Sequence, residues 1–308
     1  MTDLDQPHGI LVVDKPEGLT SHDVVARARR ILKTKRVGHT GTLDPFATGV
    51  LVLLIGKATR LAQFIDKDDK EYVATLQFGC ETDSGDKTGV PTKDSGLAEN
   101  DIANRLAAID WDHVLSKFRG KIQQVPPMYS AKKIEGKKLY ELARAGQEIE
   151  RKRVSVEIKE LEIVSSSQIG NPHSEFRIRV VCSAGTYIRV LAEDIGRYTG
   201  VRAHLQELRR TRAGRFDLNQ SLTLDQLEST QNVARHLRPI EEAVSHLPKY
   251  VLSDDRIEKT RNGLSTRVAD SLFNGGDHVQ MMGIGFGVIA IGQFNKNENS
   301  LKPVIVLG

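Results

Sequence analysis

Cysteine is scarce in this 308-residue chain, which contains only Cys80 and Cys182, far apart in the sequence. Two cysteines exclude a disulfide scaffold, and their spacing matches neither a CxxC motif nor a zinc site. Long apolar runs are also missing, because the longest, residues 50–55, is far shorter than the ~20 residues of a membrane span. The N-terminus is acidic and polar, unlike a signal peptide. We therefore expect a soluble, cytoplasmic protein that does not enter a membrane.

The common signatures of cofactor binding are missing as well. Residues 49–57 have the wrong spacing for the phosphate-binding GxxxxGK[ST] motif, and the glycines at 283, 285 and 287 lack the dinucleotide spacing. The sequence contains no HExxH zinc motif and no GxSxG nucleophile elbow. We expect an enzyme of this sequence to act with its side chains alone, without a metal or a cofactor.

Positive charge is concentrated in two segments. The formal net charge is only +4, but residues 119–153 hold ten Lys or Arg against four Glu, and residues 202–215 hold five Arg against one Glu. Concentrated charge strengthens the field that a phosphate backbone meets. A solvated charged face is the alternative explanation, because many charge runs have no partner.

Hydrophobic periodicity predicts a series of strands and helices. Thr20 precedes Asp23 at capping-box spacing, and a helix follows whose basic residues face away from its apolar side. These basic residues are Arg27, Arg29, Arg30 and Lys33. Strands are predicted over residues 10–13, 72–78 and 176–182, and a second helix from Gly185-Thr186 to near Gly200.

Residues 38–49 are predicted to be a loop. They contain three glycines, a proline and three threonines, and they lead into the buried run 50–55. A polar, glycine-rich loop anchored on a core strand is a common place for chemistry.

The chain is predicted to divide at Leu247-Pro248, into domains 1–247 and 248–308. Residues 81–101 are acidic and loop-like, and residues 120–150 are predicted to extend from the core because they combine Pro126-Pro127 with glycines and basic residues. Beyond residue 247, short strands alternate with glycines and Asn-rich turns, a pattern typical of a small β-barrel.

Five segments, in order, resemble the motifs of TruB-type pseudouridine synthases. GHTGTLDPFATGVL (residues 38–51) is similar to the family's catalytic loop, and DKPEG (residues 14–18) to its N-terminal motif. VPPMYSAKK followed by GKKLY (within residues 125–140) resembles the RNA-binding insertion, and CSAGTYIR (182–189) and HLQELRR (204–210) resemble later active-site motifs. Residues 248–308 match the family's C-terminal PUA-type barrel only loosely.

The resemblance implies an α+β fold with a mixed, largely antiparallel sheet, an inserted thumb at about residues 120–150 and a PUA-like C-terminal barrel. It implies conversion of a uridine to pseudouridine, with uridine 55 in the T-loop of tRNA as the usual target. The expected partner is tRNA, bound through its T-stem loop by a monomer that needs no protein partner.

Asp44 is implied to be the catalytic residue, paired with Arg189. Breaking the bond between uracil N1 and ribose C1′ develops oxocarbenium character, which an ionised carboxylate stabilises or attacks, as in retaining glycosidases. Uracil can leave as a delocalised anion, rotate and return through C5, so one carboxylate in a dry pocket suffices. A guanidinium keeps that carboxylate ionised and orients it.

Further site residues are implied by the same resemblance. Tyr72 is implied to lie against the target base and Leu208 to line the pocket, although both suit core packing. His39 is implied to hold the RNA loop open, and Lys15 and Tyr187 to support the site. Phosphate contacts are expected from the thumb, which we expect to be mobile, and from a second basic group. The residues concerned are Lys132, Lys133, Lys137, Lys138, Arg209 and Arg210.

Three other functions stay open from sequence. A non-catalytic RNA-binding or RNA-folding protein would need the basic segments but neither Asp44 nor Arg189. A guide-dependent relative inside an RNA–protein particle would have less use for a long RNA-binding insertion. A glycosidase would need an acid/base partner for Asp44, and none is evident in the sequence.

Overall fold

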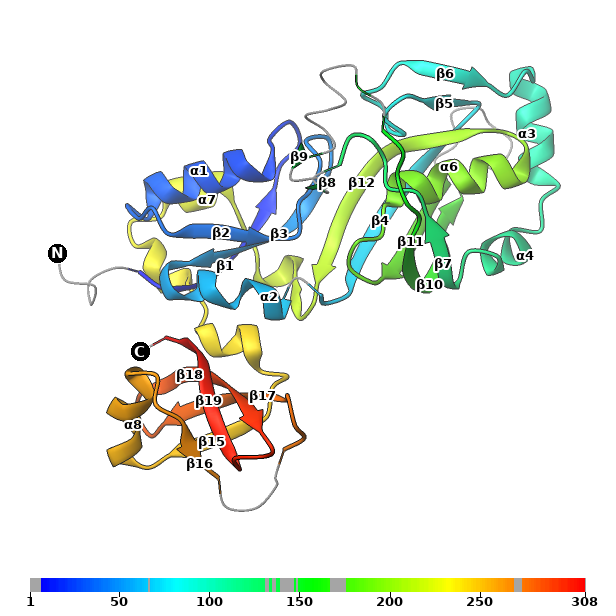
Figure 1. The fold of residues 1–308 in the computed structure, drawn as a ribbon. Helices are drawn as coiled ribbons and strands as arrows, with labels where there is room; N and C mark the ends of the chain where they lie inside the picture. The colour runs from blue at the N-terminus through cyan, green and yellow to red at the C-terminus, as the bar shows by residue number, and fades with distance from the viewer. Residues whose placement is uncertain are drawn as a thin grey trace.

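The computed structural model describes residues 7–65, 67–130, 133–134, 137–138, 147, 149–166, 176–268 and 273–307. Within these ranges the chain forms a ten-stranded sheet, a five-stranded sheet and two two-stranded sheets. Figure 1 shows the large sheet running through the longer body, with the five-stranded sheet forming a separate lobe near the C-terminus. The two large sheets, each partly covered by helices, confirm the predicted α+β class.

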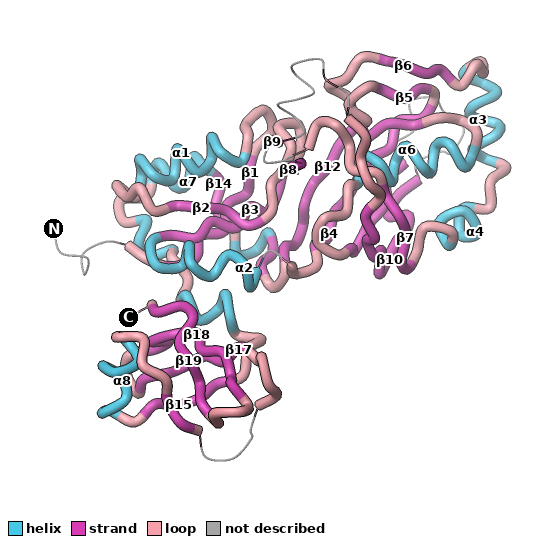
Figure 2. Tube along the Cα trace, in the orientation of Figure 1, coloured by secondary structure: helices cyan, strands magenta, loops and turns pink. Residues whose placement is uncertain are grey.

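The N-terminal part of the large sheet is built on β1 (Gly9–Lys15) and β3 (Thr48–Ile55), which pair antiparallel along β1. Between them in sequence lie α1 (Ser21–Ile31) and β2 (Val37–Thr40). Thr20 and Asp23 form the predicted capping box at the start of α1, so this element is confirmed. Alternate residues of β1 and β3 face opposite sides, and α1 with α7 (Leu224–Ser229) covers one of them (Figure 2).

The prediction that residues 38–49 form a loop throughout is wrong at both ends. Residues 37–40 are strand β2, because Gly38 and His39 pair with Leu54 and Leu53 of β3, and Thr48 already belongs to β3. The irregular part is therefore residues 41–47. Pairing with β3 has overridden the unfavourable glycine at position 38, whereas Val37 and Thr40 themselves favour a strand.

The rest of the large sheet carries the strands around which the site is built. Its strand order is β14-β1-β3-β12-β4-β11-β10-β7, with β2 on β3 and β13 on β12. The strands not yet introduced are β4 (Lys70–Phe78), β7 (Gly120–Gln124), β10 (Val154–Ser166), β11 (Phe176–Cys182), β12 (Ala203–Ala213), β13 (Phe216–Asp217) and β14 (Leu222–Thr223). Strand β12 runs parallel to β3 and antiparallel to β4, and most other pairs are antiparallel, as predicted.

Helix α6 (Ile188–Thr199) lies against β4 and β12 and ends at Gly200, as predicted. Gly200 has φ +73°, the left-handed conformation that commonly ends a helix. The apolar residues of α6 share one core with Tyr72, Ile178 and Leu205 from three strands. This core also takes up α3 (Glu99–Ala107) and α4 (Trp111–Ser116).

The acidic stretch 81–101 is more ordered than predicted. It contains most of β5 (Cys80–Thr82) and all of β6 (Pro91–Asp94), which pair with each other, and α3 begins at Glu99. Much of the predicted thumb, including Lys132, lies outside the described residues. Within it, β8 (Lys133–Ile134) and β9 (Lys137–Lys138) form a short antiparallel pair.

The C-terminal lobe is a curled sheet of order β15-β17-β18-β19-β16. Its elements are β15 (Lys249–Leu252), α8 (Asp254–Arg261), β16 (Thr266–Arg267), β17 (His278–Gly283), β18 (Gly287–Asn295) and β19 (Ser300–Val306). This half-barrel is consistent with the PUA-like domain expected here. Val288, Ile291 and Leu307 pack in one cluster with residues of β1 and β3, which attaches the lobe to the large sheet.

Short segments join these elements. They are the 3-10 helices Gly56–Leu61, Leu218–Gln220, Val233–His236 and Ile240–Val244, and the one-turn helix α2 (Ala62–Ile65).

Candidate active site

Asp44 and Arg189 meet at the edge of a cavity, although they lie far apart in the sequence. Arg189 Nε is 3.0 Å from Asp44 Oδ2, with Asp44 on the loop before β3 and Arg189 in the first turn of α6. Asp44 keeps 33% of its side-chain surface open, although protein atoms crowd its carboxylate. Burial raises the pKa of Asp44 above its usual value, while Arg189 and Lys15 oppose that rise and Asp86 adds to it. The carboxylate therefore depends on these two cations for its ionised form.

Arg189 is held by more groups than Asp44 alone. Its Nη1 donates to the carbonyl of Ser84 (2.8 Å) and its Nη2 to the carbonyl of Tyr129 (2.7 Å). Nη1 also lies 3.4 Å from Oδ2 of Asp86. The guanidinium thus bridges two carboxylates and is fixed in orientation, as a pre-organised site requires.

Asp86 is a member of the site that sequence reasoning missed, because it sits in the stretch expected to be an acidic loop. Its Oδ1 accepts hydrogen bonds from Ser84 Oγ (2.9 Å) and from the Thr88 backbone N–H (2.9 Å). The loop is fastened to β12, since the backbone N–H of Lys87 donates to Leu205 O (2.9 Å). One signal was available in the sequence, because an Asp two residues before a Thr in a Gly-containing segment favours a tight hydrogen-bonded turn.

Lys15 supports the predicted catalytic loop. Its buried ammonium group donates to the carbonyls of Pro16 (2.8 Å), Leu19 (2.7 Å) and Pro45 (3.2 Å). Burial lowers the pKa of Lys15 to about 8, against the attraction of Asp44. Lys15 therefore ties the DKPEG turn to the residue after Asp44.

Two further features fix the loop. Ser21 Oγ bonds to both the N–H (2.9 Å) and the carbonyl (3.1 Å) of Leu43. Gly49 has φ +102°, and a Cβ there would lie 2.2 Å from the carbonyl oxygen of Arg210. Strand β3 can therefore approach β12 this closely only with glycine at position 49.

The cavity beside Asp44 brings together most of the predicted site residues. It measures about 250 Å³, just below the ~300–1,000 Å³ of small-molecule sites. Asp44, Tyr72, Tyr187, Arg189 and Leu208 all line it. Burial raises the pKa of both tyrosines, so both phenols are protonated at neutral pH. The volume suits one nucleoside rather than a longer segment.

Arg210 and Arg209, both predicted to contact RNA, lie on opposite faces of β12. Arg210 is 1% exposed, and its guanidinium donates to the carbonyls of Val50 (2.7 Å) and Gly41 (3.0 Å), so it supports the loop and the cavity floor. Arg209 is partly exposed and pairs with Asp14 (2.7 Å). Only Arg209 of this pair is accessible at the surface.

His39 lies on β2 rather than in the loop. Its ring packs edge-on against His22 at the start of α1, with centroids 5.4 Å apart. His39 is not among the residues that line the cavity beside Asp44, so the two histidines mark a neighbouring surface.

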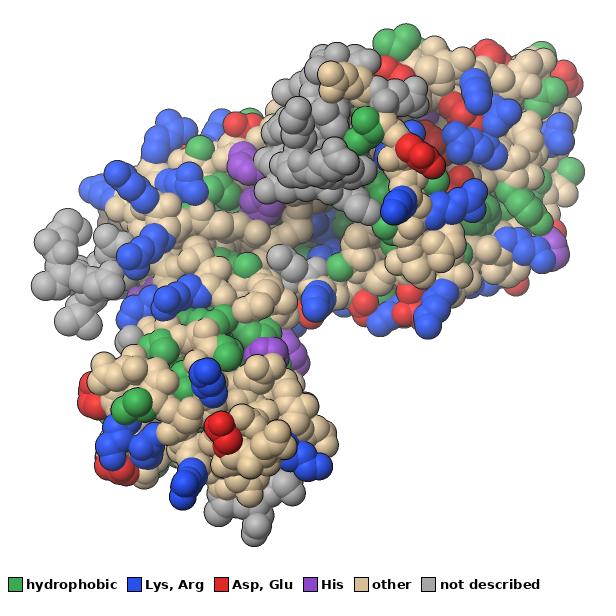
Figure 3. All heavy atoms as spheres, in the orientation of Figure 1, with side chains coloured by type: hydrophobic (Ala, Val, Ile, Leu, Met, Phe, Trp, Pro, Cys, Tyr) green, Lys and Arg blue, Asp and Glu red, His purple; other side chains and the backbone are tan. Residues whose placement is uncertain are grey.

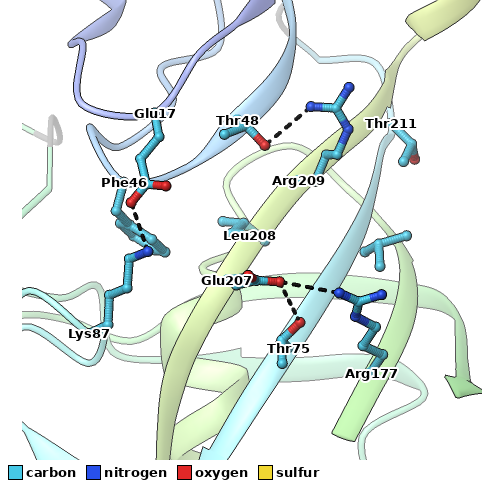
Figure 4. A pocket seen from close by; sticks show the side chains of 11 residues that line it. Glu17, Phe46, Thr48, Thr75, Lys87, Arg177, Glu207, Leu208, Arg209 and Thr211 are labelled. Atoms are coloured by element: carbon cyan, nitrogen blue, oxygen red, sulfur yellow. Dashed lines mark hydrogen bonds and ion pairs between the residues drawn. The ribbon is translucent and has the colours of Figure 1, made fainter. Parts of the chain in front are cut away.

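A second cavity, of about 320 Å³, lies on the other face of the β4–β12 ladder and is shown in Figure 4. Four of its charged side chains form two pairs: Lys87 Nζ lies 2.7 Å from Glu17 Oε1, and Arg177 lies 3.5 Å from Glu207. Since neither Asp44 nor Arg189 lines it, this cavity is separate from the predicted reaction site.

A basic surface on α1 and the turn after it was not recognised from sequence as a charge cluster. Residues 27–36 contain six Lys or Arg and no acidic residue, and five of the six are exposed. Figure 3 shows Lys and Arg side chains gathered over the part of the molecule that carries α1. The side chains of Lys132, Lys133, Lys137 and Lys138 lie outside the described part of the chain, so their role stays a prediction.

The described residues offer neither a metal site nor a membrane span. Within those ranges, no cluster of three or more His, Cys, Asp and Glu side chains is arranged to hold a metal ion. None of the helices described combines the length and the apolar character of a transmembrane segment.

Comparison with known proteins identifies the family. Residues 29–188 match the model of the TruB family pseudouridylate synthase N-terminal domain, and residues 189–245 match that of the tRNA pseudouridylate synthase B C-terminal domain. The chain is 41% identical over 277 residues to tRNA pseudouridine synthase B of Bacillus subtilis (strain 168), covering 88% of each chain. It is 40% identical over 306 residues to that of Bacillus pumilus (strain SAFR-032), covering 97% of each.

Solved structures share the fold. A crystal structure of a Cbf5-Nop10-Gar1 complex contains a chain that matches with a TM-score of 0.70 and 27% identity, over 99% of this chain and 87% of that one. A structure of an H/ACA RNP bound to a substrate RNA matches with a TM-score of 0.68 and 26% identity, over 97% and 85%. Fold and family models together define an isomerase that acts on uridine in RNA. The chain belongs to the TruB family of pseudouridylate synthases.

Proposed function

We propose that this protein converts the uridine at position 55 in the T-loop of tRNA to pseudouridine, with Asp44 as the catalytic residue. The observation that carries the proposal is the Asp44 carboxylate, held 3.0 Å from Arg189 at the edge of a cavity sized for one nucleoside. The relatives named tRNA pseudouridine synthase B support tRNA as the substrate.

The reaction assigned to the site replaces the C1′–N1 bond of the uridine with a C1′–C5 bond. The C1′–N1 bond breaks, and Asp44 stabilises or attacks the developing oxocarbenium ion while uracil leaves as an anion. The base then rotates, and a C1′–C5 bond forms. C5 loses its proton and N1 gains one, so no water, oxidant or reductant enters. Leu208 helps to exclude water, which strengthens the attraction between Asp44 and the positive charge on the sugar.

Arg189 and Tyr72 have distinct proposed roles. Arg189 keeps Asp44 ionised and, through its bonds to the carbonyls of Ser84 and Tyr129, fixes the orientation of the pair. Tyr72 is assigned to the contact with the base. Burial raises the pKa of Tyr72, whereas the neighbouring Arg210 favours the phenolate, which is the form able to take a proton from the sugar or the base.

Binding of the RNA is assigned to several surfaces. The target base must leave its stack at a cost of roughly a few kcal/mol. We assign the His22–His39 pair to contact with the RNA loop from which the base is extruded. The thumb lysines, Arg209 and the basic surface of residues 27–36 supply phosphate contacts. Arg210 is assigned to support of the loop instead, because its guanidinium is buried.

We divide the chain into two domains with separate tasks. Residues 1–247 form the catalytic domain with the thumb at about 120–150, and residues 248–308 form a PUA-like RNA-binding domain. We further propose that the protein acts as a monomer and needs no protein partner. We place its activity in the cytoplasm, because a chain with two unpaired cysteines suits a reducing compartment.

The alternative of a glycosidase is disfavoured by the position of Asp86. It is the second carboxyl group near Asp44, but its oxygens are engaged with Arg189, Ser84 and Thr88. It is also absent from the lining of the cavity. A general acid must come within hydrogen-bond reach of the leaving group, and Asp86 is not placed to do so.

The guide-dependent alternative rests on the solved structures of RNA–protein complexes, at 26% and 27% identity. Relatives that are 40% and 41% identical are named as tRNA enzymes, which favours a protein that selects its own target.

The purified protein is therefore expected to convert an isolated T-stem-loop RNA without a guide RNA. Mass spectrometry after chemical tagging of pseudouridine is the test, and binding without conversion would support a non-catalytic RNA-folding protein.

A further inference from the structure

Gln124 is a buried polar residue at the point where the chain leaves the core for the predicted thumb. It is the last residue of β7 and is 1% exposed. Its side-chain amide bonds in both directions to one residue, because Tyr187 N–H donates to Gln124 Oε1 (2.9 Å) and Gln124 Nε2 donates to Tyr187 O (3.2 Å). A buried amide that meets both a donor and an acceptor fixes the relative position of two backbones.

The residue that Gln124 holds immediately precedes α6. Tyr187 occupies the N-cap position of that helix, and its own side chain does not cap it. Tyr187 lines the cavity, and Arg189 follows two residues later. A displacement at Tyr187 therefore moves the guanidinium that contacts Asp44.

A second contact joins the same segment to the site. Tyr129, five residues after Gln124, accepts a hydrogen bond from Arg189 Nη2 (2.7 Å) through its carbonyl. On the returning side of the thumb, Arg151 Nη1 donates to Pro126 O (3.2 Å). The root of the thumb thus reaches Arg189 in two ways, directly through Tyr129 and indirectly through the Gln124–Tyr187 pair.

We propose that Gln124 is a positioning residue for isomerisation, which locks the start of α6 to the root of the RNA-binding thumb so that Arg189 faces Asp44. The inference rests on the proposed function and adds a residue that touches neither RNA nor the reacting atoms. RNA bound by the thumb and the chemistry at Asp44 are then coupled through the buried Gln124 amide, in addition to the direct contact of Arg189 with the Tyr129 carbonyl. The effect of losing this amide falls on the chemical step rather than on RNA affinity, because the phosphate contacts lie elsewhere.

The test compares Gln124→Met with Gln123→Met. Methionine keeps the length and volume of glutamine but removes both hydrogen bonds to Tyr187. Gln123 lies on the same strand with its side chain exposed, so its replacement is the matched control. We expect single-turnover rates with a T-stem-loop RNA to fall by about 10²-fold in Gln124→Met, the cost of an ångström-scale misplacement. The dissociation constant for the RNA should stay within about twofold, and Gln123→Met should match the parent.

A second variant distinguishes positioning from simple loss of stability. In Gln124→Glu, a neutral carboxyl group supplies one donor and one acceptor, as the amide does, whereas the ionised form offers acceptors only and repels Tyr187 O. The rate of this variant relative to the parent should therefore decrease as the pH rises, while its RNA affinity stays constant.

Each outcome decides the question. A Gln124→Met rate within about twofold of the parent, the range of neutral surface substitutions, overturns the proposal. So does a loss of rate and RNA affinity together in folded protein, since that indicates a structural role. A parent protein that binds the RNA but does not isomerise it refutes the proposed function instead, so the two failures are distinct.

Discussion

The guanidinium of Arg189 and the carboxylate of Asp86 lie 3.4 Å apart, and both side chains are more than nine-tenths buried. Asp86 therefore holds Arg189 through a different nitrogen from the one that contacts Asp44. Burying a cation without a partner is costly, and Asp86 offsets that cost while leaving Nε directed at Asp44. The proposed catalytic pair is thus the outer part of a three-residue array.

Replacing Asp86 should slow the reaction without weakening RNA binding. Asp86→Asn removes a charged anchor of Arg189, and hydrogen bonds to charged groups contribute about 1.5–3 kcal/mol. If that orientation is needed only in the transition state, kcat should fall by about ten- to a hundredfold at unchanged KM. The control is Asp101→Asn, at an exposed position of α3. A raised KM at normal kcat would contradict the assigned role.

The pH dependence of the same variant provides a separate test. Burial raises the pKa of Asp44, so in the parent the activity that needs its ionised form is lost as the pH falls through a raised value. Asp86 adds to that rise, so its neutralisation lowers the pKa of Asp44 as long as Arg189 keeps its contact with Asp44, which is the larger influence. The acid limb of kcat should therefore move to lower pH in Asp86→Asn. Rapid-quench kinetics across the acidic range can measure it, and a limb displaced upward would disprove the electrostatic account.

How much of this site could be predicted from sequence depends on the kind of contact. The Thr20–Asp23 capping box and the end of α6 at Gly200 follow from local signals, and both were predicted. The Asp44–Arg189 pair came from motif resemblance, since no local pattern joins such distant residues. Asp86 was missed because its importance depends on a long-range fold that presses its loop against β12.

Arg210 illustrates the opposite error. In sequence it belongs to a run of arginines, which indicated a phosphate-binding surface, but alternation along β12 turns it inward while Arg209 faces outward. Which residues of a basic strand are exposed depends on the register of the sheet. The pairing of residues 37–40 with β3 is likewise a long-range contact, which their local composition does not indicate.

The thumb lysines should contribute affinity and salt dependence but little to the chemical step. Changing Lys132, Lys133, Lys137 and Lys138 to Ala is expected to weaken tRNA binding and to reduce the slope of log K against log salt by about three. The maximal rate at saturating RNA should change much less. A charge-matched control replaces four exposed lysines of the catalytic domain that lie outside the thumb and the basic surface: Lys67, Lys93, Lys117 and Lys159. An unchanged salt slope in the thumb variant would rule out its role in phosphate binding.

Catalysis should continue after exhaustive chelation. The sequence contains none of the common motifs for metal or nucleotide binding, and the chemistry assigned to Asp44 needs neither group. A short, stable stem-loop is the right substrate, because full-length tRNA itself needs magnesium to fold. Activity on the stem-loop that EDTA abolishes and magnesium restores would show that the site has a metal requirement.

The central claim is that Asp44 carries out isomerisation of one T-loop uridine. Unmodified tRNA transcript should be incubated with the parent protein and with Asp44→Asn, then tagged for pseudouridine and analysed by mass spectrometry. We predict one pseudouridine, at position 55, with the parent and none with the variant, which should still bind tRNA within about tenfold, or ~1.4 kcal/mol. Clear conversion by Asp44→Asn, or no conversion by the parent, would contradict the account.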